Sequence, residues 1–392
     1  MANRHSAWSR RRHKILVTGT CGLPSSMEKF AMTSRRTPRL RVAVAGVGSF
    51  AQRVLIPGLC VSELAEVVAV FGPTPMKTQE VADRNSVPGV FNDYEAMLDD
   101  AKPDAVVIAT PNDVHLPMSL AASGRGIHIV CEKPLGIDLA QATQMHDHAA
   151  GAGVRTAVNF TYRSTTSFRH LRHLVWSGAI GALRHFTVTF HQDIRASPLT
   201  PLGFRMLRER GGGSLLDVGI HMIDTVRWLA GEFHSVAGTA STVVRSRPTS
   251  NGEPGEVTAD DTASFVAKMV SGATGIVQVS QVAFGRGGFR RIELFGSEGS
   301  AVMEEERNES PTIRLAGAGT SGLIDAPTPD RLHVSFEDFP RAHVERMLRS
   351  IGGVQPEYGD DPWPTFADGL MAHRVVDAVE RSATRGEWVV VT

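Results

Sequence analysis

Residues 41–51 constrain the fold of this 392-residue chain more than any other segment. They read RVAVAGVGSFA, an apolar run rich in valine that ends in the pattern G-x-G-x-x-A. Gly46 permits a tight turn, Gly48 allows a close backbone approach, and the small Ala51 permits close packing of a helix on a strand. The pattern therefore predicts a strand, a turn and a helix whose N-terminus faces a phosphate group.

The segments that follow repeat this alternation of strand and helix. Apolar strands are predicted at 42–45, 66–71, 105–109, 127–131 and 156–160, and helices at 49–60, 76–85, 94–99, 114–123 and 139–149. Such an alternation indicates parallel βαβ units, whose strands are covered on both faces and are therefore apolar throughout. Residues 39–160 are predicted to form a Rossmann domain, a doubly wound α/β sheet with a dinucleotide site.

The pattern changes after residue 160, where turns rather than helices separate the strands. After a helix at 165–177, strands are predicted at 184–192, 236–244, 261–270, 275–283, 289–296, 301–305 and 312–315, and loops at 247–255 and 316–330. The segment 271–274 is typical of a hairpin turn. A helix at 366–383 and a short strand at 388–391 end the chain. Residues 161–392 are therefore predicted to form an α+β domain with an open, mostly antiparallel sheet.

Residues 1–38 differ from both predicted domains. Nine basic residues and one acidic residue lie between Arg4 and Arg39, which predicts a flexible basic leader. A twin-arginine export signal is the alternative for residues 9–12, but the apolar run after them, 15–17, is shorter than such a signal needs. A second alternative is that the protein begins at Met32, eight residues before the first strand.

Composition excludes several classes of function. The 41 basic residues balance 41 acidic ones, so the chain has no global positive field for nucleic acid. No apolar stretch reaches the ~18 residues of a membrane-spanning helix. The three cysteines, Cys21, Cys60 and Cys131, lack the spacing of a zinc site and are predicted to be core thiols. Together these features predict a cytoplasmic protein without nucleic-acid or membrane partners.

The end of the second predicted strand bears on the kind of dinucleotide. An Asp or Glu ~20 residues after the glycines would bind the ribose hydroxyls of NAD. Residues 70–77 read VFGPTPMK and hold no carboxylate. The small Gly72, the hydroxyl of Thr74 and the charge of Lys77 suit a 2′-phosphate instead. The sequence therefore favours NADP over NAD, the alternative being a loop whose side chains never touch the ribose.

A lysine follows the fifth predicted strand, in the segment VCEKP at 130–134. Ligands of open parallel sheets bind beyond the carboxyl ends of the strands, so Lys133 is predicted to face the binding crevice. Its ammonium group can stabilise negative charge on a substrate oxygen during hydride transfer. The alternative is a surface ion pair with Glu132. The bond between Lys133 and Pro134 is a candidate for the cis form.

The segment GGGSLLDVGIHMID at 211–224 is the most informative run in the second half of the chain. Asp217, His221 and Asp224 lie at i, i+4 and i+7, which places them on one face of a helix. His221 can exchange a substrate proton, because the usual pKa of histidine lies near neutrality. Asp217 can orient the substrate or the imidazole. The alternative is an acid near a helix N-terminus and a core histidine.

Together these motifs resemble the Gfo/Idh/MocA family, named for glucose–fructose oxidoreductase, inositol dehydrogenase and a rhizopine-catabolism protein. The resemblance covers residues 40–392 and is carried by AGVGSFA (45–51), ATPNDVH (109–115), CEKPLG (131–136), NFTYR (159–163), GGGSLLDVGIH (211–221) and the tail at 365–379. It implies NAD(P)-dependent hydride transfer to or from a sugar, polyol or related carbonyl compound, without a metal. It also implies a homo-oligomer, a dimer or a tetramer, that contacts its copies through the open sheet.

The resemblance also implies roles for individual residues. Lys133 matches the lysine near the nicotinamide, and Asp217 and His221 match the family's acid and proton-transferring histidine. The predicted cofactor contacts are Gly46, Gly48, Ser49, Phe50, Ala51, Gly72, Thr74, Lys77, Thr110, Asn112, His115, Glu132, Lys133 and Arg163, with Tyr162 beside the last of these. The usual aromatic–arginine pair of the family stands here as Phe204-Arg205, without an assigned role.

Two functions from other classes stay open for this fold. A regulator could sense NAD(P) without catalysis, since a fold does not determine a function. It would not need Lys133, Asp217 and His221 together. An NAD-dependent glycoside hydrolase is the second alternative, which turnover of aryl glycosides would reveal.

Overall fold

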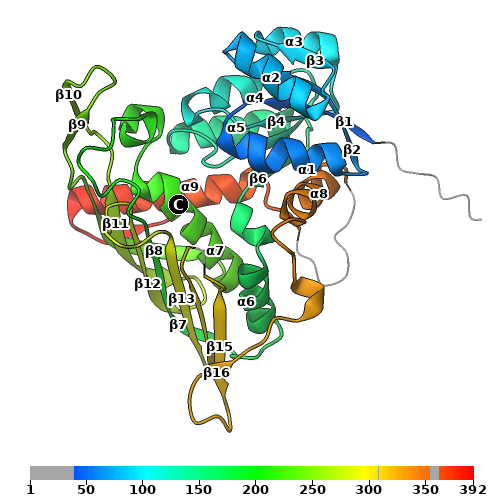
Figure 1. The fold of residues 1–392 in the computed structure, drawn as a ribbon. Helices are drawn as coiled ribbons and strands as arrows, with labels where there is room; N and C mark the ends of the chain where they lie inside the picture. The colour runs from blue at the N-terminus through cyan, green and yellow to red at the C-terminus, as the bar shows by residue number, and fades with distance from the viewer. Residues whose placement is uncertain (1–38, 308, 354–361) are drawn as a thin grey trace, which may run out of the picture. The chain divides into compact units, whose positions relative to one another are not determined.

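Two β-sheets organise the residues that the computed structural model describes, 39–307, 309–353 and 362–392 (Figure 1). The first sheet is built from residues 40–159 and the second from residues 183–390. The predicted leader lies outside the described residues, so its structure stays a prediction, as does the domain boundary near residue 160.

The first sheet has six parallel strands in the order β3-β2-β1-β4-β5-β6. The strands are β1 (Leu40–Ala45), β2 (Ala65–Phe71), β3 (Gly89–Phe91), β4 (Ala105–Ile108), β5 (His128–Glu132) and β6 (Thr156–Asn159). This order confirms the predicted Rossmann sheet, in which successive strands are added on one side of β1 up to β3 and on the other side from β4 onward. Every residue of β4 is buried, as expected of a strand covered on both faces. Only β3 was not predicted.

Helices connect these strands. They are α1 (Ile56–Val61), α2 (Pro75–Asn85), α3 (Tyr94–Ala101), α4 (His115–Ser123) and α5 (Leu139–Gly151). Asp93 and Asp138 precede α3 and α5, and each carboxylate accepts a backbone N–H of the first turn at 2.8 Å. The helix predicted at 49–60 contains a π turn, η1 (Ala51–Leu55), before α1. Pro57 is the second residue of α1 and follows directly on this π turn.

The second sheet has nine strands in the order β16-β15-β14-β13-β7-β12-β11-β8-β17. They are β7 (Leu183–His191), β8 (Phe233–Ser241), β11 (Thr262–Met269), β12 (Thr274–Ser280), β13 (Phe289–Gly296), β14 (Gly299–Glu305), β15 (Thr312–Gly317), β16 (Ile324–Asp325) and β17 (Val389–Val390). Only the pair β12–β7 is parallel. The predicted open, mostly antiparallel sheet is therefore confirmed, with β11 and β12 joined at the predicted hairpin.

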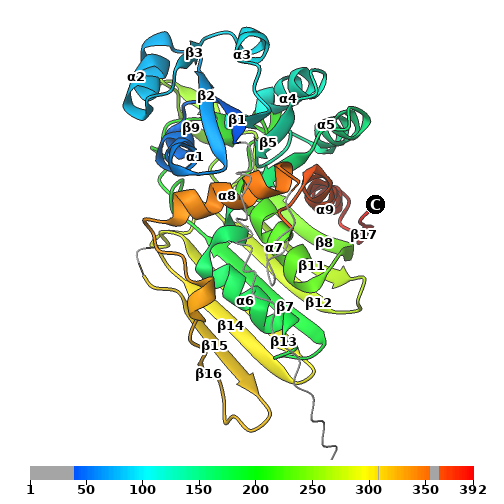
Figure 2. The ribbon, with the colours of Figure 1, turned by 90° about the vertical axis from the view of Figure 1, so that its right-hand side faces the viewer.

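Three helices lie on one face of the second sheet, α6 (Thr166–Trp176), α7 (Ile220–Ala230) and α9 (Phe366–Arg385) (Figure 2). Phe186, Phe265 and Val277 point into the core beneath them. Val266 and Ile276 pair across β11 and β12 on the other face and are 39% and 42% exposed. The predicted homo-oligomer contact would use this open face. In the described part of the chain, no helix combines the length and the apolar character that a membrane crossing needs.

Four local predictions need correction. The predicted loop at 247–255 includes parts of a short antiparallel pair, β9 (Ser246–Pro248) and β10 (Pro254–Glu256), and β16 lies within the predicted loop at 316–330. A helix that was not predicted, α8 (Phe339–Ile351), packs on α1. Cys131 is buried as predicted, but Cys60, in the last turn of α1, is exposed and is not a core thiol.

Candidate active site

A cavity of about 380 Å³ lies beyond the carboxyl ends of β1, β4 and β5. It is lined by Gly48, Ser49, Phe50, Ala51, Arg53, Ala109, Thr110, Pro111, Asn112, Glu132, Lys133, Phe204 and Arg205. Three segments predicted from the sequence therefore meet here: the glycine turn, the loop after β4 and the Glu132-Lys133 pair. The first domain supplies most of this wall, and Phe204-Arg205 comes from the second half of the chain.

The glycine turn has the conformation that a dinucleotide site requires. Gly46 has φ +112°, and a Cβ atom there would lie 2.3 Å from the carbonyl oxygen of Ala109. Gly48 is exposed to the cavity, and an added Cβ would have no neighbour nearer than 4.0 Å. Backbone can therefore approach a pyrophosphate closely at Gly48, at the start of a helix. The residues present fit a nicotinamide dinucleotide.

The end of β2, where the sequence predicts the ribose contact, has no room for a side chain at position 72. Gly72 is buried, and a Cβ atom on it would lie 2.5 Å from Oγ1 of Thr78 and 2.8 Å from a methyl group of Val47. Thr74 and Lys77 are exposed at the beginning of α2. A side chain at position 72 would therefore displace its neighbours, whereas a hydroxyl and an ammonium are available nearby.

Lys133 forms an ion pair with Asp217 instead of the alternative pair with Glu132. Its Nζ donates to the backbone carbonyl of Asp217 at 2.8 Å and to Oδ1 of the same residue at 2.9 Å. An ammonium group has three N–H donors, so one is left for a ligand. The peptide bond to Pro134 is cis. Lys133 is 16% exposed and lines the cavity.

Asp217 is an ionised carboxylate surrounded by cations. Its Oδ2 accepts a hydrogen bond from Gln281 at 3.0 Å and lies 3.3 Å from Arg195, and its Oδ1 lies 3.7 Å from Nε of Arg205. Burial would raise the pKa of Asp217, but the charges of Lys133, Arg195 and Arg205 hold that pKa well below its usual range. Asp217 therefore orients Lys133 and does not exchange protons near neutral pH.

His221 lies one turn beyond Asp217, but the intervening turn is not the regular α-helix that the spacing predicts. Residues Leu215–Gly219 form a π turn, η6, before α7 begins. The imidazole packs against Tyr162, with ring centroids 4.8 Å apart, and its Nδ1 has no hydrogen-bond partner among the described residues. Burial and the charge of Lys133 lower the pKa of His221 well below its usual value. The neutral ring can therefore accept a proton.

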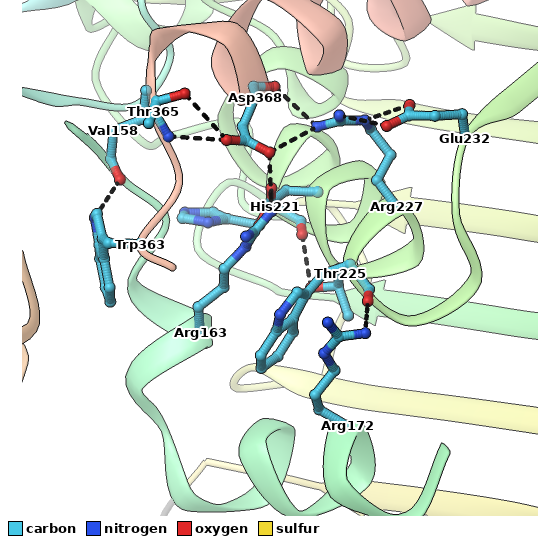
Figure 3. Close-up of polar contacts among 12 residues, drawn as sticks. Val158, Arg163, Arg172, His221, Thr225, Arg227, Glu232, Trp363, Thr365 and Asp368 are labelled. Carbon is cyan, nitrogen blue, oxygen red and sulfur yellow. Dashed lines mark hydrogen bonds and ion pairs between the residues drawn. The ribbon is translucent and has the colours of Figure 1, made fainter. Parts of the chain in front are cut away.

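Arg163 and Asp224 pair with each other. Nε and the NH2 group of Arg163 donate to the two carboxylate oxygens of Asp224 at 2.9 and 2.6 Å, and both side chains are buried. Figure 3 shows Arg163 between α7 and the N-terminus of α9, where Asp368 lies 3.7 Å away. The carboxylate of Asp224 thus binds Arg163 and does not join the pair of Lys133 and Asp217. The guanidinium of Arg163 is engaged in this ion pair, and its predicted contact with a cofactor stays a prediction.

The loop after β4 divides into lining and supporting residues. Thr110 and Asn112 line the cavity, and Asn112 donates to the carbonyl of Gly211 at 2.9 Å. His115 is fully buried, with its ring nitrogens 2.9 Å from the carbonyl of Pro134 and 3.0 Å from that of Thr110. His115 therefore ties this loop to the Lys133 turn. Its predicted cofactor contact also stays a prediction.

Glu132 is the carboxylic acid among the residues that line this cavity. Its Oε1 accepts a hydrogen bond from Nδ2 of Asn159 at 2.5 Å. Burial raises the pKa of Glu132 to about 7, against the opposing effects of Lys133 and Asn159. The charge on this wall therefore changes close to neutral pH.

This fold and this site define a Rossmann-type dinucleotide-binding protein in which residues of the second half of the chain complete the cluster around Lys133. Residues 40–160 match the oxidoreductase family with an NAD-binding Rossmann fold, and residues 168–302 match the GFO/IDH/MocA C-terminal domain. The chain belongs to the Gfo/Idh/MocA family of oxidoreductases.

Several distant relatives of the chain bear the names of sugar dehydrogenases. Levoglucosan dehydrogenase of Pseudarthrobacter phenanthrenivorans is 29% identical over 346 residues, 80% of this chain and 87% of that protein. D-xylose 1-dehydrogenase (NADP(+)) 2 of Haloferax volcanii is 27% identical over 354 residues, 88% of this chain and 98% of that protein. A solved structure of levoglucosan dehydrogenase in complex with NADH and L-sorbose has a TM-score of 0.81 and 27% identity, covering 90% of this chain and 99% of that chain.

Proposed function

We propose that this protein is an NAD(P)-dependent oxidoreductase that interconverts a secondary alcohol and a ketone in a sugar, a polyol or a related small molecule. The main support is the arrangement of Lys133, Asp217 and His221 beside a cavity that the glycine turn also lines. The relatives named above bear dehydrogenase names, and the same chemistry is proposed here for this chain. A cytoplasmic location and assembly as a homo-oligomer stay predictions.

Each residue of the site has a separate role in the proposed reaction. A bound nicotinamide coenzyme supplies the hydride acceptor for alcohol oxidation, or the hydride for the reverse reaction. The free N–H of Lys133 donates to the substrate oxygen and stabilises the negative charge that grows on it. An imidazole nitrogen of His221 takes the hydroxyl proton during oxidation and returns it during reduction. Asp217 holds Lys133 in place, so the site is organised before the substrate binds.

The two alternative functions, a dinucleotide-sensing regulator and a glycoside hydrolase, account for these residues less completely. A regulator that only senses a dinucleotide has no use for a neutral buried histidine beside a directed ammonium group. A glycoside hydrolase would need the same coenzyme but would regenerate it within each turnover, without net reduction. The direct test is absorbance at 340 nm with either coenzyme and a panel of levoglucosan, D-xylose, myo-inositol and D-glucosides. Coenzyme reduction supports the dehydrogenase, whereas release of aryl aglycones without it supports the hydrolase.

The pKa of His221 predicts the pH dependence of alcohol oxidation. The histidine must be neutral to accept a proton, so activity falls as pH drops through its pKa, which lies well below 6.5. We expect kcat/KM to stay level from neutral pH to below pH 6.5 and to fall only in more acidic buffer. The profile should be measured in the Glu132→Gln variant, because Glu132 titrates near pH 7. A midpoint at or above pH 6.5 in that variant would exclude His221 as the base.

Coenzyme choice gives a second prediction. We expect NADPH to bind about tenfold more tightly than NADH, since one charged contact to a 2′-phosphate contributes roughly 1.5 kcal/mol or more. The Lys77→Gln variant should lose that preference and keep its affinity for NADH. Arg84→Gln, at the other end of α2, is the matched control and should change neither Kd. Fluorescence titration of the two coenzymes measures both constants, and equal effects of the two variants would contradict the role of Lys77.

A further inference from the structure

We propose that Gln281 and Arg195 are positioning residues, which act through Asp217 to set the direction of the Lys133 ammonium. This inference rests on the proposed function, since it gives Lys133 its orientation for hydride transfer. Neither residue belongs to a motif visible in the sequence. They come from two different loops of the second sheet and meet on the same carboxylate oxygen.

Gln281 is fully buried immediately after β12. Its Nε2 donates to Oδ2 of Asp217 at 3.0 Å, and its Oε1 accepts a hydrogen bond from Arg195. The amide orientation is determined by these partners, because the opposite orientation would direct lone pairs at the carboxylate and N–H groups at the guanidinium. The backbone N–H of Gln281 donates to the carbonyl of Asp261 at 2.9 Å. Its side chain is therefore held in one position.

Arg195 lies in the loop after β7 and is 6% exposed. Its NH2 group lies 3.3 Å from Oδ2 of Asp217. The loop is itself anchored by buried Arg247, whose guanidinium donates to the carbonyls of Arg195 at 2.5 Å and of Ser197 at 2.7 Å. Gln281 and Arg195 thus bind one oxygen of Asp217, while Lys133 binds the other.

The donors are divided between the two oxygens of the Asp217 carboxylate, and this arrangement determines the direction of the Lys133 ammonium. Oδ1 and the backbone carbonyl of Asp217 accept two N–H groups of Lys133, and the carbonyl belongs to the π turn η6. If Oδ2 lost its donors, the carboxylate could rotate about its Cβ–Cγ bond and the ammonium would lose its fixed direction. A displacement of ~1 Å at a reacting group can cost about 10²-fold in rate.

The Gln281→Glu variant tests this role through pH. The introduced carboxyl would meet a defined set of charged or titratable groups: Asp217 and Arg195 by direct contact, with Lys133, Arg205 and His221 around Asp217. A protonated Glu donates an O–H to Oδ2 of Asp217, as the amide does. An ionised Glu repels that carboxylate while still binding Arg195. The variant should therefore be competent at low pH and impaired at high pH.

The measured quantity is the kcat/KM of each variant divided by that of the wild type at the same pH. We expect this ratio for Gln281→Glu to fall about tenfold or more between pH 5.5 and pH 8.5. Gln281→Met, which lacks both polar atoms, should lose about 10²-fold at every pH and keep its coenzyme Kd within about threefold. Gln278→Met, on the exposed face of the same strand, is the control and should match the wild type.

The outcomes separate this inference from the proposed function. A wild type that turns over, together with a pH-independent ratio for Gln281→Glu or an unimpaired Gln281→Met, overturns the positioning role alone. A wild type that reduces neither coenzyme with any sugar or polyol overturns both. If the Gln281 variants do not fold, Arg195→Lys takes their place. It keeps the charge but loses the paired donors, so about a tenfold loss of kcat/KM supports the role, and no loss overturns it.

Discussion

Replacing Lys133 with methionine is expected to lower kcat/KM about 10²–10³-fold, the typical effect of removing one donor that stabilises charge in the transition state. Methionine keeps most of the length and apolar character of the side chain but removes the ammonium. Asp217 would still be bound by Gln281 and Arg195, so the site should remain folded. Steady-state rates with the best substrate, together with the coenzyme Kd, measure the effect.

The control for this variant is Lys102→Met, which removes an ammonium directly after α3, at a residue that does not line the cavity. Its rate should equal that of the wild type. A Lys133→Met enzyme with normal kcat/KM would show that the ammonium does not act on the substrate oxygen. A variant that loses coenzyme affinity in proportion to its rate would show a binding role instead.

The Asp224→Asn variant is expected to lose about 3–5 kcal/mol of unfolding free energy, the usual effect of removing one partner of a buried ion pair. Asparagine has nearly the same shape, so the loss reports charge and not volume. The carboxylate of Asp368, which lies farther from Arg163 at 3.7 Å and is 31% exposed, would not replace the lost ion pair in full. Equilibrium unfolding in urea, followed by circular dichroism, measures the change.

Glu232 provides a matched control, because it lies at the exposed end of the ion pairs that connect Asp224, Arg163, Asp368 and Arg227. Glu232 accepts two hydrogen bonds from Arg227, at 2.7 and 2.8 Å, but is 45% exposed (Figure 3). Glu232→Gln should therefore cost less than ~1 kcal/mol. The double variant Arg163→Met with Asp224→Leu should recover much of the stability, since it leaves no buried charge unpaired. An Asp224→Asn protein as stable as the wild type would contradict this account of the pair.

The sequence predicts the parts of this fold that local chemistry determines. The glycine turn can be predicted because position 46 requires glycine. Its φ of +112° is unfavourable for other residues, and a Cβ atom there would clash with the carbonyl of Ala109. Most strands of the first sheet can be predicted because both of their faces are buried, which makes them continuous apolar runs in the sequence. In contrast, β3 has three residues, too few to show a pattern. For α8 a signal exists, since Val344, Met347, Leu348 and Ile351 recur at helical spacing and are buried.

The structure brings together Lys133 and Asp217, the central pair of the predicted site, with neighbours that were not predicted. Lys133 and Asp217 lie 84 positions apart in sequence, and their motifs alone indicate that they could meet. Arg195 and Gln281 follow strands of the second sheet, and their meeting depends on the register of β7 with β12. No local pattern encodes that register. The i, i+4, i+7 spacing of Asp217, His221 and Asp224 misleads in part, because Asp217 lies within a π turn and not in a regular α-helix.

Transfer of deuterium tests the proposed reaction most directly. The wild-type protein should be incubated with perdeuterated D-xylose, myo-inositol and D-glucose and with each coenzyme, and the recovered coenzyme analysed by mass spectrometry. Direct hydride transfer predicts a reduced coenzyme that carries one deuterium from the substrate carbon, in an amount equal to the ketone or lactone formed. Recovered coenzyme without deuterium, under conditions in which a substrate is consumed, would contradict the proposed function.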